Sequence, residues 1–179
     1  MIHPYDRHDG PGITPMSAQI IDLYQRCYAA PPWSETPEQL GAYPAKLAAS
    51  AALPGFSALT TSDHTGRLTG VCYGWPTPAD LTGIRIYDAL ITAFGLPATT
   101  ELTRGAFEVA ELFVHPDHQG QGIASHLLTR MTAGWPTAWL ITSRHAPAAG
   151  LYRKLGWREL GPLPDDFYPE LPASVFTRA

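Results

Sequence analysis

The stretch FEVAELFVHPDHQGQGIASHLL, residues 107–128, decides the fold that we predict for this chain. Its first part, residues 107–114, is rich in aromatic and β-branched side chains, which predicts a strand that Pro116 ends. Apolar residues then recur at helical spacing, which predicts a helix beginning near Gly120: Ile123, Leu127 and Leu128. The sequence therefore predicts a strand, a turn that contains glycine and a helix in direct succession.

The turn between this strand and helix suits the binding of a pyrophosphate. It reads Gln119-Gly120-Gln121-Gly122-Ile123-Ala124, and its glycines let the backbone approach a ligand with no side chain in the way. The first amides of a helix have no partner inside the helix, and they lie at the positive end of its dipole. A dinucleotide-binding G-x-G-x-x-G fits less well, because Ser125 stands where the third glycine would be.

A second motif, AAGLYRKLGW, occupies residues 148–157. The two motifs together resemble the signatures of the GNAT superfamily of N-acetyltransferases, R/Q-x-x-G-x-G/A after a hydrophobic strand and A-x-x-L-Y-x-K-x-G-F/W. The first of these binds acetyl-CoA in that family. One departure is His145, which stands where the family often has Asn, seven residues before the Tyr of the second signature. The resemblance covers residues 56–160 well, and the first 50 residues fit by pattern only.

Length and composition limit the class of protein. The 179 residues suffice for one domain with a substantial core, and a hydrophobic content of 45% with 16% charged residues is typical of a soluble globular chain. No apolar run of about 18 residues occurs, which argues against a membrane span, and no signal peptide is evident. The net charge of −4 argues against nucleic acid as a partner. Cys27 and Cys72 lie in apolar surroundings, which favours buried thiols in a reducing cytoplasm.

The remaining elements are interpreted from capping and turn signals. Ser17 is expected to cap a helix that ends at Tyr28, and Thr36 one that runs to about Ala52. Gly66 is expected to form the turn of a hairpin. The other expected elements are a first strand at 2–5, hairpin strands at 56–62 and 67–75, one or two helices within 79–105, a strand at 138–142, a helix at about 146–155, and strands from 157–160 and at 174–177.

The resemblance implies an α/β (α+β) fold in a single domain over residues 1–179. The GNAT-type central sheet would be mixed but mostly antiparallel, with six to seven strands that splay between the fourth and the fifth, and about four helices would flank it. Pantetheine would fill the splay and bond to the backbone of Leu112, Phe113 and Val114, where an amide could polarise the thioester carbonyl. The other cofactor-binding residues implied are Gln119, Gly120, Gln121, Gly122, Ile123, Ala124, Ser125, His145 and Tyr152.

Acetyl transfer to an amine also requires proton transfers, for which the chain offers three candidate catalytic residues. Glu108 and Glu111 are candidates for the base, but residues three apart on a regular strand face opposite sides, so an unbulged strand would offer only one of them. A free Glu has a pKa of about 4.3 and an alkyl ammonium one near 10, so burial or a water relay must assist. In the resembled family, the Tyr at the position of Tyr152 protonates the departing thiolate.

The acceptor is expected to be a small, cationic, partly apolar amine. Trp33, Tyr28 and Tyr87 could offer aromatic faces to an ammonium, an attraction worth about 0.5–2 kcal/mol. We expect the amine to lie between the Pro31–Glu35 loop, the segment 79–105 and the loop 161–172. By the resemblance, the segment 79–105 often shapes the acceptor pocket. The acidic net charge would help to attract a cation.

Several alternatives stay open at this point. A non-catalytic acyl-CoA-binding or regulatory module would keep the fold, and a protein or peptide N-acetyltransferase would keep the chemistry. The identity of the amine, the choice between Glu108 and Glu111, and a homodimeric assembly are left open as well. We expect no membrane or nucleic-acid partner. We also expect no metal, because His115 and His118, which have H-x-x-H spacing, lie in a phosphate turn, where zinc sites are rare.

Overall fold

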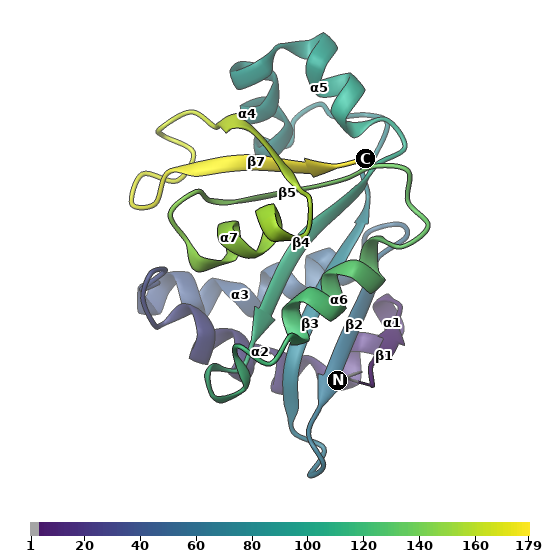
Figure 1. Cartoon of the computed structure of the whole chain (residues 1–179), viewed down its shortest axis with the longest axis vertical. Coiled ribbons are helices and arrows are strands. Elements are labelled where there is room, and N and C mark those ends of the chain that lie inside the picture. The colour runs from purple at the N-terminus through teal and green to yellow at the C-terminus, as the bar shows by residue number, and fades with distance from the viewer. Residues whose placement is uncertain (1–3) are drawn as a thin grey trace. The chain divides into compact units, whose positions relative to one another are not determined.

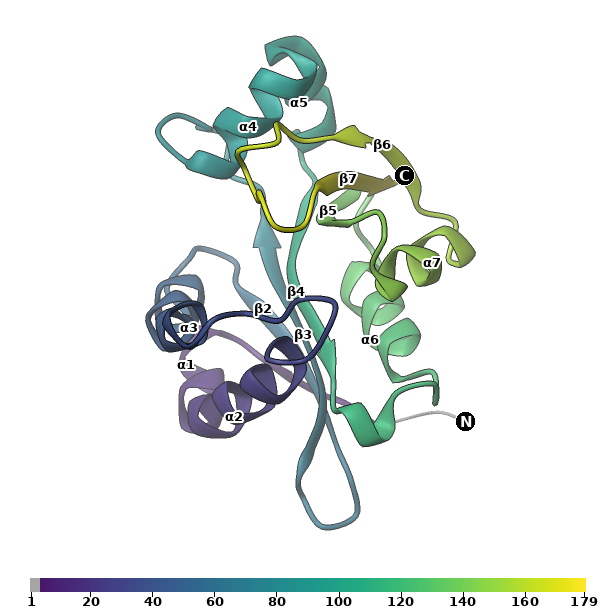
Figure 2. The same ribbon diagram turned by 90° about the vertical axis from the view of Figure 1, so that its left-hand side faces the viewer.

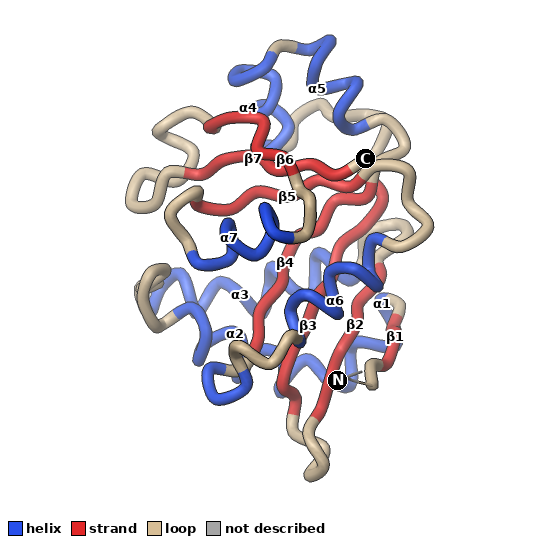
Figure 3. The backbone as a smooth tube through the Cα atoms, viewed as in Figure 1, coloured by secondary structure: helices blue, strands red, loops and turns tan. Residues whose placement is uncertain are grey.

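The computed structural model describes residues 4–179. Within these residues, seven strands form one hydrogen-bonded sheet in the order β1-β2-β3-β4-β5-β7-β6 (Figure 3). The sheet is mixed and mostly antiparallel. The described residues form two compact units, one of residues up to Trp75 with Val109–Ala133, and one of Pro76–Glu108 with Gly134–Ala179. The predicted fold class is confirmed, although residues 4–179 hold more helices than the expected four. The prediction of a single domain stays a prediction.

The first unit contains the strands β1 (Asp6–His8), β2 (Ser57–Ser62) and β3 (Leu68–Pro76) and most of β4 (Phe107–Val114). Strands β1, β2 and β3 pair antiparallel, with Leu59 opposite Cys72. The predicted hairpin turn is present, because Gly66 has φ +82° and the Asp63 carboxylate accepts bonds from the backbone amides of Thr65 and Arg67. The expected first strand is displaced: β1 begins at Asp6, and residues 2 and 3 lie outside the described part.

Helices cover both faces of this first group of strands. Figure 2 shows α1 (Gly10–Ile13), α2 (Ser17–Tyr28) and α3 (Pro37–Ala51) on one face and α6 (Ile123–Thr132) on the other. A Cβ on Gly70 of β3 would lie 2.7 Å from Ile123 Cγ2 and 3.1 Å from Leu127 Cδ1, so α6 packs directly onto the strand. The opposite face is built from stacked aromatic rings, with Tyr24 and Tyr43 centroids 3.5 Å apart.

The capping predictions had mixed outcomes. Thr36 forms the predicted capping box with Gln39, since its hydroxyl accepts from the Gln39 amide at 3.2 Å and the Gln39 side chain accepts from the Thr36 amide at 2.8 Å. The prediction for Ser17 is wrong. Asp9 caps a helical run that passes through α1 and the 3₁₀ turn η1 (Thr14–Met16), so the backbone is already helical where α2 begins.

The second unit consists of β5 (Ala138–Ser143), β6 (Arg158–Pro162) and β7 (Ala173–Arg178) with α4 (Arg85–Phe94), α5 (Leu96–Thr103) and α7 (Pro147–Lys154). Figure 1 labels these elements except β6, which is labelled in Figure 2. Strand β7 is antiparallel to both neighbours, whereas β5 runs parallel to the start of β4 over only two residue pairs, Phe107 with Ala138 and Glu108 with Trp139.

The core of the second unit has two sides because successive residues of β7 face opposite ways. Val175 packs with Tyr87 and Leu90 of α4, while Phe176 contacts the ring of Tyr152 on α7. The segment 79–105 thus forms two helices, which Gly95 separates with φ +80°. Among residues 4–179, every helix is too short or too polar to cross a bilayer.

Candidate active site

The predicted phosphate turn lies between the 3₁₀ turn η2 (Pro116–His118) and α6. Gly120 and Gly122 have φ values of +74° and +83°, and nothing lies within 4 Å of a Cβ built on either. Because these left-handed conformations are not helical, α6 begins at Ile123, three residues later than predicted. Gly122 has no side chain to cap the first-turn amides of Ile123, Ala124 and Ser125, the groups that would bind a pyrophosphate.

The end of β4 is joined to this turn by side chains. The carbonyl of Val114 accepts bonds from Gln119 Nε2 at 3.2 Å and from the thiol of Cys27 at 3.3 Å. The Gln119 side chain therefore joins the turn to the end of β4. Phe113 and Val114 are buried, and Leu112 is half-buried.

Glu111 is the centre of a polar cluster within the first unit. Its side chain is 8% exposed and accepts bonds from the Tyr28 hydroxyl at 2.8 Å and from Lys46 Nζ at 2.6 Å. These partners come from α2 and α3, so Glu111 faces the helices opposite α6. Burial raises the pKa of Tyr43, and the charge of Glu111 raises it further, which keeps that phenol protonated beside the carboxylate.

A second carboxylate, Glu35, belongs to the same cluster. The Tyr24 hydroxyl lies 3.0 and 3.1 Å from the two carboxylate oxygens of Glu35. The backbone amide of Glu35 donates to the Tyr28 carbonyl at 2.9 Å. The pKa of Glu35 is raised, mainly because the carboxylate is partly buried and also because of the negative charge of Glu111. The hydrogen bond from Tyr24 and the positive charge of Lys46 partly offset this rise in the pKa. Trp33 completes the loop, with its ring centroid 5.5 Å from that of Tyr28.

Sequence reasoning missed Glu35 and Lys46. Lys46 lies 65 residues from Glu111 in the chain, so no local pattern connects the two residues. The available signal was scarcity, since Lys46 and Lys154 are the two lysines of the sequence.

Glu108 has a different environment, within the second unit. It is 4% exposed and accepts a bond from the Tyr87 hydroxyl at 2.7 Å. Tyr87 is itself 2% exposed and packs edge-on against Trp139, whose indole donates to Thr77 Oγ1 at 2.8 Å. The ring of Tyr87 therefore packs in the core of the second unit. Its role as a substrate-binding residue stays a prediction.

The second motif forms α7 and the turn after it, where Gly156 has φ +82°. Tyr152 is 6% exposed and contacts Trp157 and Phe176 with centroid distances of 6.0 and 5.9 Å. His145 is exposed just before the helix, and its amide donates to Ser143 Oγ at 3.3 Å. The roles predicted for Tyr152 and His145 stay predictions.

The histidine pair near the turn is engaged with protein groups. His115 is 4% exposed, its Nε2 lies 2.7 Å from a guanidinium nitrogen of Arg67, and its Nδ1 accepts from the Asp117 amide at 3.2 Å. Burial and the Arg67 charge lower the pKa of His115, and the same charge would oppose a metal cation. Within residues 4–179, no three His, Cys, Asp or Glu side chains lie together as a metal site would require.

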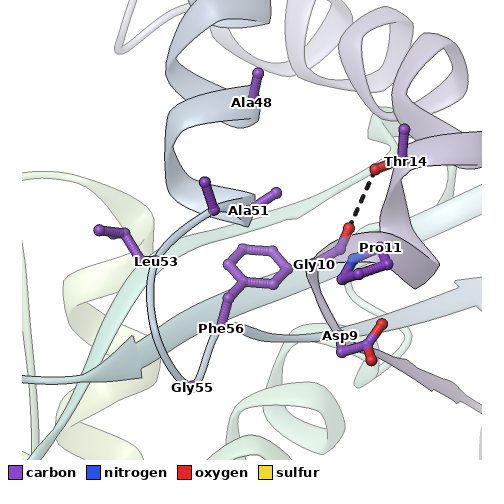
Figure 4. A pocket seen from close by; sticks show the side chains of 10 residues that line it. Asp9, Gly10, Pro11, Thr14, Ala48, Ala51, Leu53, Gly55 and Phe56 are labelled. Atoms are coloured by element: carbon purple, nitrogen blue, oxygen red, sulfur yellow. Dashed lines mark hydrogen bonds between the residues drawn. The ribbon is translucent and has the colours of Figure 1, made fainter.

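A surface pocket of about 600 Å³ lies elsewhere in the first unit, between α1 and the end of α3 (Figure 4). Its lining is mostly apolar, and the polar groups there serve local structure: Asp9 caps α1, and the Thr14 hydroxyl donates to the Gly10 carbonyl at 3.2 Å. None of the predicted site residues lines this pocket.

Comparison with solved structures shows in which proteins this fold recurs. No curated protein sequence matches the chain. A GNAT-family protein from Desulfovibrio desulfuricans has a TM-score of 0.69 at 14% identity, covering 99% of this chain and 98% of its own. The ribosomal-protein-S18-alanine N-acetyltransferase of Escherichia coli gives 0.65 at 16%, with 98% and 92% covered. A phosphinothricin acetyltransferase from Sinorhizobium meliloti, solved with acetyl-CoA, gives 0.61 at 13%, with 99% and 88% covered.

Such low identities establish the fold alone, and a separate similarity to a family is found in the sequence. Residues 79–159 match the family model described as the acetyltransferase (GNAT) domain. This range includes β4, the phosphate turn and the AAGLYRKLGW motif, which are the segments that carried the resemblance. Residues 79–159 of this chain are therefore similar in sequence to the GNAT acetyltransferase domain, and residues 4–179 have the fold of solved GNAT acetyltransferases.

Proposed function

We propose that this chain transfers the acetyl group of acetyl-CoA to the primary amine of a small cationic molecule, by direct attack within a ternary complex. The observation that carries the proposal is the bond of 2.6 Å between the buried carboxylate of Glu111 and the primary ammonium of Lys46. A carboxylate that holds a lysine ammonium has the chemistry needed to hold the amino group of an acceptor.

The donor would bind through backbone groups. The first-turn amides of α6, with the open positions of Gly120 and Gly122 before them, would receive the pyrophosphate. The backbone of Leu112–Val114, directly after Glu111, would hold the pantetheine arm, and one of its amides would polarise the thioester carbonyl. A phosphinothricin acetyltransferase that shares the fold was solved with acetyl-CoA, which supports this donor.

We assign Glu111 as the base and Glu108 as a positioning residue for α4. Glu111 is bonded to an amine, the functional group that must lose a proton, whereas Glu108 is bonded to the core residue Tyr87. The ammonium proton would leave through Glu111 or through water beside it. Tyr152 would protonate the departing thiolate.

The acceptor would be held by Tyr28 and Trp33 near Glu111, with the cation facing their rings. We place the reaction in the reducing cytoplasm, which fits Cys27 and Cys72 being free thiols.

The test is a panel of polyamines, aminoglycosides, aryl-alkyl amines and amino-terminal peptides, assayed with acetyl-CoA by the release of thiol. We expect turnover of small cationic amines, and acetylation of peptides alone would contradict the proposed substrate class. Two isosteric variants test the base. Glu111→Gln should lower turnover by about 10²–10⁴-fold while Glu108→Gln changes it far less, and the reverse order would assign the base to Glu108.

Donor binding has its own test. Gly122→Asp would place a negative side chain at the turn that is proposed to hold the pyrophosphate, and it should weaken acetyl-CoA binding in a calorimetric titration. A folded Gly122→Asp protein with unchanged affinity would mean that the donor binds elsewhere.

A further inference from the structure

Lys46 already presents a primary amine at the group that we propose as the base. Its Nζ lies 2.6 Å from Glu111 Oε1, and the other carboxylate oxygen accepts from the Tyr28 hydroxyl at 2.8 Å. The carboxylate is nearly buried, but the Lys46 side chain is 55% exposed. The amine is thus held at the carboxylate by a side chain that is more than half exposed.

We infer that Lys46 is a modification site, an internal acceptor whose Nζ the chain acetylates from its own bound acetyl-CoA. The inference rests on the proposed function with Glu111 as the base. The side chain is tethered, so the amine needs no encounter step, and tethering can raise the effective concentration of a reactant far above that of a free amine.

The reaction is balanced with the groups already named. The ammonium of Lys46 loses one proton by way of Glu111 to solvent, and the neutral amine attacks the thioester carbonyl. A C–N bond forms and the C–S bond breaks, and the thiolate of CoA takes a proton from Tyr152 or water. The nitrogen loses its second proton to solvent as the amide forms, and that proton restores the group that protonated the thiolate. The products are N-acetyl-Lys46 and CoA, and no oxidant or metal takes part.

Acetylation would change the charge of the cluster. An amide keeps one N–H donor but loses the positive charge, so Glu111 and Glu35 would face each other's field with less compensation. A site with two carboxylates and no internal cation would favour an external ammonium. Lys46 would then stop competing for Glu111 once it is modified.

The sequence supplies an internal control. Lys154 is exposed at the C-terminal end of α7 and is the other lysine of the chain. Any direct chemical acetylation by acetyl-CoA would label it, so the ratio between the two lysines separates catalysed from uncatalysed modification.

The experiment incubates the full-length protein with isotope-labelled acetyl-CoA and measures label on each lysine by peptide mass spectrometry. We expect labelling of Lys46 at a rate independent of protein concentration and about 10²-fold faster than that of Lys154. Equal rates at the two lysines, or a Lys46 rate proportional to protein concentration, would overturn the inference.

Two variants keep the test decisive. Gly122→Asp, in the donor turn, and Glu111→Gln, at the base, should each remove the excess labelling of Lys46 and leave that of Lys154 unchanged. If purified parent protein already carries unlabelled acetyl-Lys46, the same mark should be absent from the Glu111→Gln protein, and its presence there would overturn the inference. Turnover of external amines by a protein whose Lys46 is neither labelled nor already acetylated would refute this inference alone, whereas absence of acetyl-CoA binding would refute the proposed function.

Discussion

Gly70 on β3 offers a direct test of how α6 is seated and of what that seating does for the donor turn. A Cβ at this position would lie 2.7 Å from Ile123 Cγ2, 2.9 Å from Thr61 Oγ1 and 3.1 Å from Leu127 Cδ1. We predict that Gly70→Ala destabilises the protein and displaces the start of α6.

The expected magnitude follows from how little these neighbours can move. Ile123 is β-branched on a helix and has one strongly preferred rotamer, and the Thr61 hydroxyl is bonded to that of Thr69 at 2.9 Å. Overpacking of this kind typically costs about 1–3 kcal/mol. For a chain of this length, each kcal/mol lowers Tm by about 2–4 °C.

The assay is urea and thermal unfolding beside a titration with acetyl-CoA. Because Ile123 carries the first helical amide of α6, its displacement should also weaken donor binding. Gly41→Ala is the matched control. It lies in α3, nothing is within 4 Å of its added Cβ, and it should stabilise the protein by about 0.5–1 kcal/mol with donor binding unchanged.

A Gly70→Ala protein as stable as the parent would refute the packing argument. Lower stability with unchanged acetyl-CoA affinity would instead show that the donor turn is insensitive to the position of Ile123.

Three further predictions concern single side chains. Tyr152→Phe should lower turnover by about 10²–10⁴-fold with acetyl-CoA affinity retained, and kinetics within about twofold of the parent would mean that water protonates the thiolate. Trp33→Ala should raise KM for cationic acceptors in the panel assay, and unchanged kinetics with every acceptor would remove Trp33 from the site. The bond from Arg153, aided by Arg144, lowers the pKa of Glu159 from 4.5 to about 2. Its stabilisation should therefore be complete above about pH 4.5 and be lost as the pH falls toward 2, so the difference in urea unfolding between the parent and Glu159→Gln should shrink from pH 6 to pH 3.

Local signals were the ones that predicted structure correctly. The capping box of Thr36, the hairpin turn at Gly66 and the stop at Gly156 each depend on residues within a few positions of one another. The backbone conformation there is set by short-range hydrogen bonds and by the freedom of glycine, so the sequence nearby is sufficient. The capping prediction for Ser17 was wrong because the cap lies outside the local segment: Asp9 begins the helical run eight residues earlier.

The partners of the two carboxylates could not be predicted from local patterns. Tyr28 and Lys46 lie 83 and 65 residues from Glu111, and Tyr87 lies 21 residues from Glu108. The alternation rule correctly indicated that the two side chains would differ in environment, but not which helices each would meet. An aromatic residue at helical spacing, such as Tyr87, has the same pattern whether it packs in a core or lines a site.

Contiguous runs of residues were enough to predict the strand–turn–helix segment of residues 107–128 and the second motif at 148–157, because their backbone geometry is encoded locally. The same runs lie within residues 79–159, which match the GNAT family model. The tertiary structure alone decided that Lys46 and Tyr28 meet Glu111, that Glu35 joins them and that Tyr87 is buried against Trp139. Those contacts depend on how helices pack on the sheet, and packing is a property of surfaces assembled from distant parts of the chain.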